Sequence, residues 1–250
     1  MGAPPPAALT AAARHALLVR THPEAREIVF DFLQGYDVLG AFWMTVKLTV
    51  FSALGSLVWG TLLAAMRVSP VPLMRGFGTA YVNIFRNIPL TVLIVFTSLG
   101  LADIFGVTMG ASDDFKLQGF RLAVLGLAAY HAAFVCEALR SGINTVPVGQ
   151  AEAARAIGLS FSQSLRLVVL PQAFRAVIGP LANVLIALTK NTTVAAAIGV
   201  AEAAYLMKAM IENEAQLVAI GAVFAFGFVV LTLPVGLLLG WLGKRLAVKR

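Results

Sequence analysis

The sequence predicts an all-α membrane protein with five transmembrane spans. Hydrophobic residues make up 59% of its 250 residues and charged residues only 12%, whereas about a quarter of the residues of a soluble domain are charged. Several runs of about 20 apolar residues follow one another, and a helix of that length crosses the hydrocarbon core of a bilayer. A net charge of +7 would suggest a nucleic-acid partner in a soluble protein. In a membrane protein the informative property is where the charged residues lie along the chain, so we expect no nucleic-acid partner.

The N-terminal residues precede the predicted bundle. Residues 1–22 begin with Pro4-Pro5-Pro6 and an alanine-rich run, lack the layout of a cleaved signal peptide, and are expected to form a flexible tail. In residues 23–37, acidic side chains recur at helical spacing opposite apolar ones, which predicts an amphipathic helix at the membrane surface. An additional packed helix would show the same pattern.

Residues 38–245 form the predicted transmembrane domain, and a basic C-terminal tail, residues 246–250, follows it. Five runs with few or no charges within this domain are long enough to be spans. They cover residues 48–66, 76–100, 118–139, 174–193 and 218–242.

The loop between the third and fourth spans, residues 147–171, is unusually polar. We expect residues 150–157 to form a short helix. Gly158 can adopt the left-handed conformation that commonly ends a helix. Ser160 and Gln163 form a capping-box pattern, which begins a second short helix. A loop with its own helices is more often functional than a simple connection.

Docking onto a partner protein explains the composition of this loop. Alanines make the first short helix thin enough to enter a groove, and Glu152 and Arg155 supply charges at its rim. Pro171 is expected to end the second helix, because proline removes a backbone donor. We therefore predict an elbow of two short helices.

The order Glu152-Ala153-Ala154, then Gly158, then Leu170-Pro171 resembles the coupling loop of permease subunits of bacterial ATP-binding cassette (ABC) importers. The stretch from Phe85 to Leu90 is similar to the Phe-Arg-Asn-Thr-Pro-Leu signature of polar amino acid permeases, with Ile88 in place of the threonine. Glu137-Ala-Leu-Arg140 and Lys190-Asn191-Thr192-Thr193 also resemble that group. The likeness covers roughly residues 38–245.

This resemblance implies a five-span type I ABC importer permease bundle with a cytoplasmic coupling-helix loop. The implied partners are a second permease, related or identical, two cytoplasmic ATPase subunits, and an extracytoplasmic solute-binding protein that delivers an amino acid. ATP and Mg would be bound by the ATPase subunits, and this chain would bind no cofactor. The residues implied to couple the permease to the ATPases are Gln150, Glu152, Ala153, Ala154, Arg155, Gly158 and Pro171.

Motifs of hydrolytic enzymes and nucleotide-binding loops are absent from the sequence. It contains no His-Glu-x-x-His, no Gly-x-Ser-x-Gly and no complete Gly-x-x-x-x-Gly-Lys-Ser/Thr. The single cysteine, Cys136, excludes an internal disulfide and a cysteine-ligated metal cluster. We therefore expect a transporter subunit without a catalytic site, driven by ATP hydrolysis on partner subunits.

Polar side chains within the spans are candidates for the substrate path. A charge at mid-bilayer costs about 2.5–3.5 kcal/mol on insertion scales, so such a residue usually faces the protein interior or a water-filled path. For Arg86 and Glu137, a structural ion pair is the alternative to a role in the substrate path, and we favour the ion pair. For residues 190–193, the alternative is that they anchor the end of a helix. The candidates are Arg86, Asn87, Glu137, Lys190, Asn191 and Thr192.

The basic residues predict the orientation. With the coupling loop inside, the majority of the 19 lysines and arginines lie on the cytoplasmic side, which places the N-terminus outside and the C-terminus in the cytoplasm of a bacterium. Glutamate is the favoured substrate, because residues 62–72 and 81–87 resemble permeases of glutamate importers from actinobacteria; glutamine and arginine are alternatives. Two other functions are possible for a protein with these spans: a non-transport membrane scaffold, and a channel that needs no delivery protein. Neither function requires a coupling loop, so the loop favours an importer.

Overall fold

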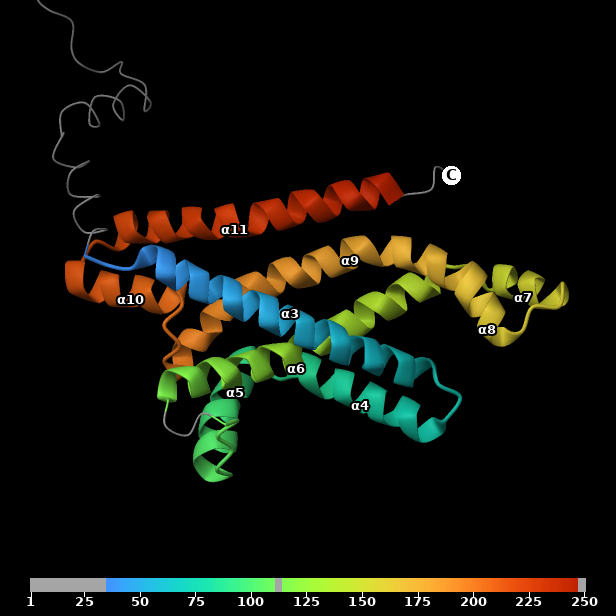
Figure 1. The fold of residues 1–250 in the computed structure, drawn as a ribbon, viewed down its shortest axis with the longest axis horizontal. Coiled ribbons are helices and arrows are strands. Elements are labelled where there is room, and N and C mark those ends of the chain that lie inside the picture. The colour runs from blue at the N-terminus through green and yellow to red at the C-terminus, as the bar shows by residue number, and fades with distance from the viewer. Residues whose placement is uncertain (1–34, 111–113, 247–250) are drawn as a thin grey trace, which may run out of the picture.

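The computed structural model describes residues 35–110 and 114–246 (Figure 1). All regular elements in these two ranges are helices. The predicted tail at 1–22, most of the predicted amphipathic helix at 23–37, and the end of the basic tail at 246–250 lie outside the described residues.

The first helix of the described residues, α3 (Val38–Val68), packs closely against α6 (Phe115–Asn144). The buried face of α3 repeats every three or four residues and is rich in small side chains, which let two helices approach. At Gly60 a β-carbon would lie 2.6 Å from the side chain of Val135, so only glycine fits at this contact. The helix is longer than the predicted span 48–66, because Asp37 caps it through the Gly40 amide (2.8 Å) and Lys47 lies half-buried within it.

The second crossing is not the single helix predicted over residues 76–100. It consists of α4 (Pro72–Asn87), α5 (Leu90–Val95) and the π-helix η1 (Phe96–Ile104), with a bend of 105° between α4 and the rest. Pro89 causes the break, because it has no amide proton and forces Ile88 into an extended conformation (ψ 133°).

In the described residues, four helices are long and apolar enough to cross a membrane individually, and the bent pair meets the same criterion only when its two parts are taken together. The four cover Val38–Val68, Phe115–Asn144, Phe161–Ile198 and Leu217–Gly243. The predicted number of spans is therefore reached only if α4 and α5–η1 are counted as one.

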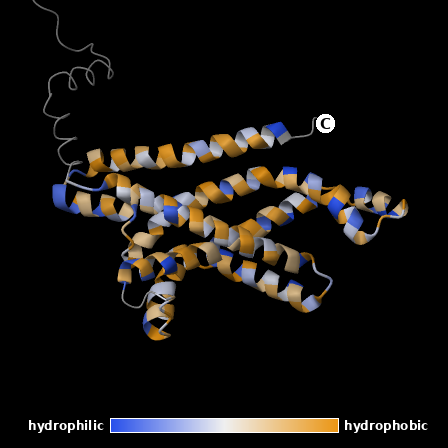
Figure 2. Ribbon diagram, viewed as in Figure 1, coloured by the Kyte–Doolittle hydropathy of each residue, from blue (hydrophilic) through white to orange (hydrophobic). Residues whose placement is uncertain are grey.

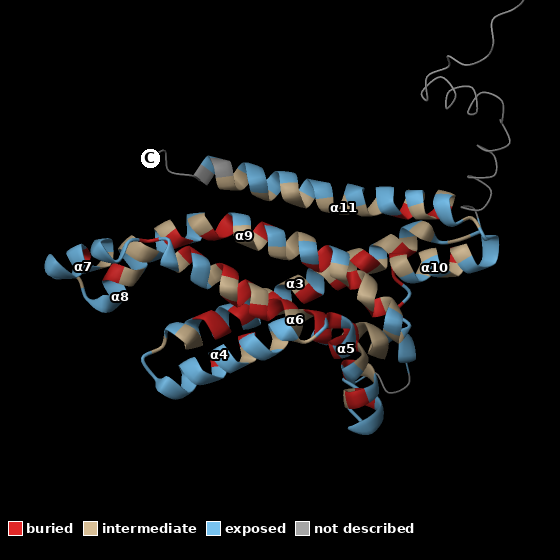
Figure 3. Cartoon of the chain, turned by 180° about the vertical axis from the view of Figure 1, so that it is seen from behind, coloured by how far each residue is buried: buried red, intermediate tan, exposed pale blue. Residues whose placement is uncertain are grey.

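The centre of the bundle is α6, which lies between α3 and α9 (Leu170–Asn191). Burial is concentrated where these three helices meet, whereas α11 (Leu217–Leu246) packs mainly on α9 and leaves most of its surface open (Figure 3). Apolar residues cover the long helices, and polar ones gather at their ends (Figure 2). An exposed apolar surface of this kind is typical of helices that face lipid.

A further helix, α10 (Ala203–Glu214), was not predicted. It follows the 3₁₀-helix η3 (Thr192–Ile198) and lies at the opposite end of the molecule from α7 (Val148–Ala156) and α8 (Phe161–Ser164) (Figure 1). The fully buried carboxylate of Glu202 caps α10 by accepting the amides of Ala204 (3.0 Å) and Tyr205 (2.9 Å). It also accepts the hydroxyl of Thr45 (3.4 Å), which ties α10 to α3.

Candidate functional site

The predicted elbow between the third and fourth spans is confirmed in its local geometry. Gly158 adopts the left-handed conformation (φ +94°), and its amide donates to the carbonyl of Arg155 (3.0 Å) at the end of α7. The capping box is present at the start of α8: the Ser160 amide donates to Gln163 Oε1 (2.9 Å), and the Gln163 amide donates to Ser160 Oγ (3.3 Å). Both features depend on neighbouring residues only, which explains why sequence reasoning found them.

The expectation that Pro171 ends the second short helix is wrong. After α8 the chain passes through one π-helical turn, η2 (Leu165–Val169), and continues directly into α9. Pro171 occupies the first turn of α9, where a missing amide proton leaves no hydrogen bond of that helix unmade. The wider π-helical turn joins the two helices without a break.

The elbow presents an exposed surface at the far end of the molecule (Figure 1). In α7 only Ala154 is buried, whereas Glu152 and Arg155 are exposed. Apolar side chains frame these charges, with Ile157 82% exposed. The elbow is tied to α9 by a hydrogen bond of 2.6 Å from Gln172 Nε2 to Gln150 Oε1. This bond joins α7 directly to a helix that is long and apolar enough to span a membrane.

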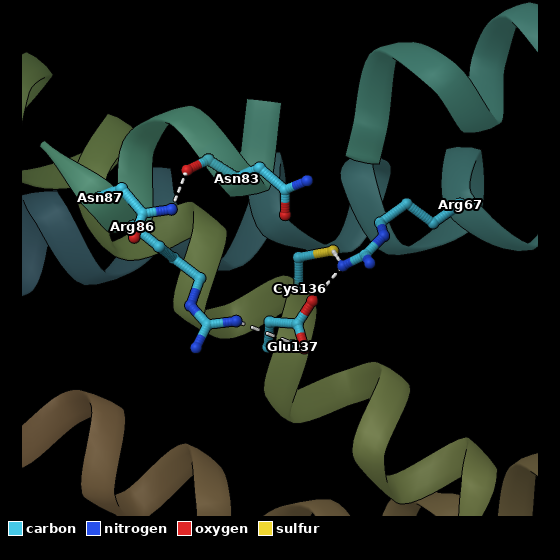
Figure 4. A network of polar contacts seen from close by, with 6 residues as sticks. All are labelled: Arg67, Asn83, Arg86, Asn87, Cys136 and Glu137. Atoms are coloured by element: carbon cyan, nitrogen blue, oxygen red, sulfur yellow. Dashed lines mark hydrogen bonds and ion pairs between the residues drawn. The ribbon is translucent and has the colours of Figure 1, made fainter. Parts of the chain in front are cut away.

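A second polar cluster centres on Glu137 of α6 (Figure 4). The predicted ion pair with Arg86 is present but loose, with 3.7 Å between Arg86 Nη1 and Glu137 Oε2, and the Arg86 side chain is 47% exposed. The closer partner is Arg67, which donates a hydrogen bond to Glu137 Oε1 and has a side chain only 9% exposed. Two cations therefore flank one carboxylate, which leaves one positive charge in excess.

Sequence reasoning missed the role of Arg67, because it assigned this residue to the turn after the first span. In the structure α4 returns along α3, and Gly78 lies against the stem of Arg67, where a β-carbon would be 2.8 Å from Arg67 Cγ. The contact between Arg67 and Glu137 joins residues that are distant in the chain, so no local pattern reveals it.

A cavity of about 310 Å³ lies beside this cluster, between α6 and α9. His131 is buried in its wall, and its Nδ1 lies 2.9 Å from the carbonyl oxygen of Leu127, to which only a protonated nitrogen can donate. Its Nε2 is then an acceptor for the side-chain amide of Asn191 at 3.1 Å. This bond uses one N–H of the Asn191 side-chain amide, and the residue also lines the cavity. The lining residues are Tyr130, His131, Phe134, Asn183, Val184, Ala187 and Asn191.

Arg86 connects the cluster to the cavity. Its guanidinium lies 5.8 Å from the ring centroid of Phe134, a residue of the cavity wall. The arrangement combines a half-exposed cation, a neutral amide and aromatic walls, which suits a small polar molecule that carries a carboxylate.

The other predicted substrate-path residues lie elsewhere. The side chain of Asn87 donates to its own helix at the Asn83 carbonyl (2.6 Å), as Figure 4 shows. Thr192 is buried and donates to the Thr189 carbonyl (2.8 Å), and Lys190 is exposed outside the cavity lining. Within the described ranges, no three His, Cys, Asp or Glu side chains are arranged to hold a metal ion.

Comparison with known proteins adds four findings. Residues 56–248 match the family model described as binding-protein-dependent transport system inner membrane component. The chain is 55% identical over 220 residues to the glutamate transport system permease protein GluC of Corynebacterium efficiens, which covers 86% of this chain and 96% of that protein. It is 32% identical over 219 residues to the probable glutamine ABC transporter permease protein GlnM of Bacillus subtilis, which covers 88% and 96%. Its fold is similar to the crystal structure of an amino acid ABC transporter with histidines, with a TM-score of 0.75 and 26% identity over 83% of this chain and 93% of that chain.

Proposed function

The chain belongs to the family of binding-protein-dependent transport system inner membrane components, and from this membership we propose that it forms the path by which an ATP-driven importer carries glutamate. The chain is a multi-pass membrane subunit of a transporter with the type I ABC importer fold. The alternative of a non-transport scaffold is therefore excluded.

The similarity to GluC is the observation that carries the choice of glutamate, because it extends over 96% of that protein's length at 55% identity. The excess positive charge of the Arg67–Glu137–Arg86 cluster supports this choice on physical grounds. Glutamate carries one net negative charge at neutral pH, whereas glutamine carries none and arginine is positive. A cation beside the path favours the anionic amino acid over both.

We place the substrate in the cavity between α6 and α9. Arg86 binds a carboxylate at the edge of the cavity, and the side-chain amide of Asn191 binds the polar groups of the amino acid. Glu137 keeps Arg86 in position until the substrate arrives, and the buried Arg67 keeps Glu137 in position. Of the six candidates from the sequence, this site uses Arg86 and Asn191 directly and Glu137 through Arg86.

The family implies ATPase and substrate-binding partners. We propose two ATPase subunits, which hydrolyse ATP and bind at the elbow, and a second permease, related or identical. The exposed surface of α7, with Glu152 and Arg155 between the apolar Val148 and Ile157, supports this assignment of the docking surface. The elbow is then cytoplasmic, the N-terminus lies outside, and the solute-binding protein delivers glutamate at the end of the molecule that carries α10.

Uptake into proteoliposomes tests the proposal. The complete complex, with ATP on the side of the ATPase subunits, is offered labelled glutamate, glutamine and arginine through the binding protein. We expect ATP-dependent uptake of glutamate that exceeds the uptake of the other two, and omission of the binding protein should abolish it. Glutamate uptake no faster than in ATP-free vesicles would exclude glutamate and leave the family assignment intact.

A further inference from the structure

A second, larger cavity lies at the elbow end of the bundle. It has a volume of about 710 Å³ and is a groove whose walls come from the last two turns of α3 and the first half of α9, together with Leu139 and Ile143 of α6. All of these segments are the parts of their helices nearest the elbow. The proposed transport path does not use this groove.

The course of the helices creates the groove. Both α3 and α9 pack on α6, and Figure 1 shows them separating toward the elbow. The contact between α6 and α9 is close at Gly142, where a β-carbon would lie 2.0 Å from Val177 Cγ2. The opposite wall, on α3, contains the small side chains of Ala64 and Ala65, which fill little of the groove. The result is a slot with a floor of α6 and open space between its two walls.

One charged side chain, Arg175, lines this otherwise apolar slot. The slot's other polar side chain, Thr61, donates its hydroxyl to the Leu57 carbonyl of its own helix (2.6 Å). Arg175 is exposed and takes part in none of the ion pairs formed among the described residues. Arg140 and Arg166, each next in sequence to a lining leucine, are likewise exposed and outside those ion pairs. Arg175 therefore supplies a positive charge inside an otherwise apolar slot.

We propose that this groove binds an anionic phospholipid, with one acyl chain in the slot and the phosphate on Arg175. Basic pockets between transmembrane helices at the cytoplasmic side are suited to anionic headgroups. A guanidinium forms strong, charge-assisted hydrogen bonds with phosphate oxygens. The exposed ring of Phe174 adds to the apolar lining next to Arg175. The assignment to the inner leaflet rests on the proposed orientation, whereas the binding itself does not.

The charge in the groove favours an anionic lipid over an apolar helix of a partner subunit. Arg175 lines the groove beside apolar side chains, so its occupant must combine an anionic group with a hydrocarbon part. An apolar helix would leave the guanidinium without a counter-charge. A single hydrocarbon chain is narrow enough to follow the slot.

Native mass spectrometry of the complete transporter tests this site without any need for transport. The complex is released from nanodiscs that contain equal amounts of phosphatidylcholine and phosphatidylglycerol, and the lipids that remain on it are counted. We expect phosphatidylglycerol to be retained in preference. Arg175→Gln should lower its occupancy about fivefold, the effect of one basic residue near a membrane surface, and Arg175→Lys should retain most of it.

A second variant tests the slot itself. Ala65→Trp fills the groove from α3 and should reduce the retention of phosphatidylglycerol, whereas Ala225→Trp, the same change on the exposed surface of α11, should not. Lys208→Gln, which removes an exposed cation from α10, is the control for charge. Equal retention of both lipids by the wild type, or unchanged retention in Arg175→Gln, would overturn the proposal. The proposal would also be overturned if the complex retained no lipid and Ala65→Trp prevented its assembly, because these results would mean that protein covers the groove.

Discussion

Arg67 and Glu137 join the last turn of α3 to the middle of the bundle through a hydrogen bond whose arginine side is buried. Arg86 approaches the same carboxylate from the other side and stays half-exposed (Figure 4). The same carboxylate therefore has one structural partner and one partner that solvent or substrate can reach. This difference sets the first prediction.

Arg67→Gln should destabilise the folded protein much more than Arg86→Gln. Removal of the buried partner leaves Glu137 with only the loose Arg86 as a compensating charge, at a cost of about 3 kcal/mol, whereas loss of a loose, exposed ion pair costs about 1 kcal/mol or less. Thermal unfolding of the purified chain measures both. In a double-mutant cycle, Glu137→Gln should couple strongly to Arg67→Gln and weakly to Arg86→Gln, and the reverse order would contradict this interpretation.

Gly158→Val should uncouple the elbow from the transport cycle while the protein still inserts into the membrane. No atom blocks a β-carbon at this position, so the penalty comes from the left-handed backbone alone, about 1–2 kcal/mol. The strain should misalign α7 and abolish substrate-stimulated ATP hydrolysis by the complex. Gly149→Ala is the matched control, because Gly149 has open space around it and an ordinary backbone conformation; if both variants hydrolyse ATP normally, the elbow does not transmit the signal.

Asn191→Asp should weaken glutamate uptake more than glutamine uptake. The change preserves shape but places a carboxylate in the cavity where the proposed site binds an anionic amino acid. We expect an additional loss of about tenfold for glutamate, equivalent to about 1.4 kcal/mol. The comparison requires competing uptake of both amino acids by the same complex, and equal losses for both would place the substrate elsewhere.

The pH dependence of stability should include a contribution from Glu202, which lies outside the membrane spans. Burial raises the pKa of this carboxyl, although hydrogen bonds from Ala204, Tyr205 and Thr45 oppose the change. The folded state then binds the proton more tightly than the unfolded state does, so this contribution is full below the ordinary pKa of 4.5 and is lost as the pH rises through the raised pKa. Thermal midpoints measured from pH 4.5 to 8 should fall more steeply for the wild type than for Glu202→Gln, and identical slopes would contradict the prediction.

Sequence reasoning succeeded where neighbouring residues decide the structure. The left-handed Gly158 and the Ser160–Gln163 capping box are both local, and both were predicted. The break at Pro89 is also local, but the apolar run around it favoured a continuous span. An acidic residue at 202 before a helical pattern could have indicated α10 in the same way.

Contacts between distant residues were beyond sequence reasoning. The pairing of Arg67 with Glu137 depends on how α4 folds back along α3, which a single sequence does not reveal. The bond between His131 and Asn191 likewise joins two helices that are separated by the elbow. The residue types of the candidate site were predictable, whereas their grouping required the structure.

The break between α4 and α5 also changes the electrostatic environment of Arg86. The last carbonyl groups of a helix have no amide partners within it, and together they carry about half a negative charge. Because α4 ends at Asn87, just before Pro89, these carbonyls belong to the same last turn as Arg86, whereas a continuous helix would have bonded them to the next turn. The C-terminus of α4 thus supplies a partial counter-charge that offsets the cost of keeping a guanidinium at membrane depth, even while its ion pair with Glu137 is open.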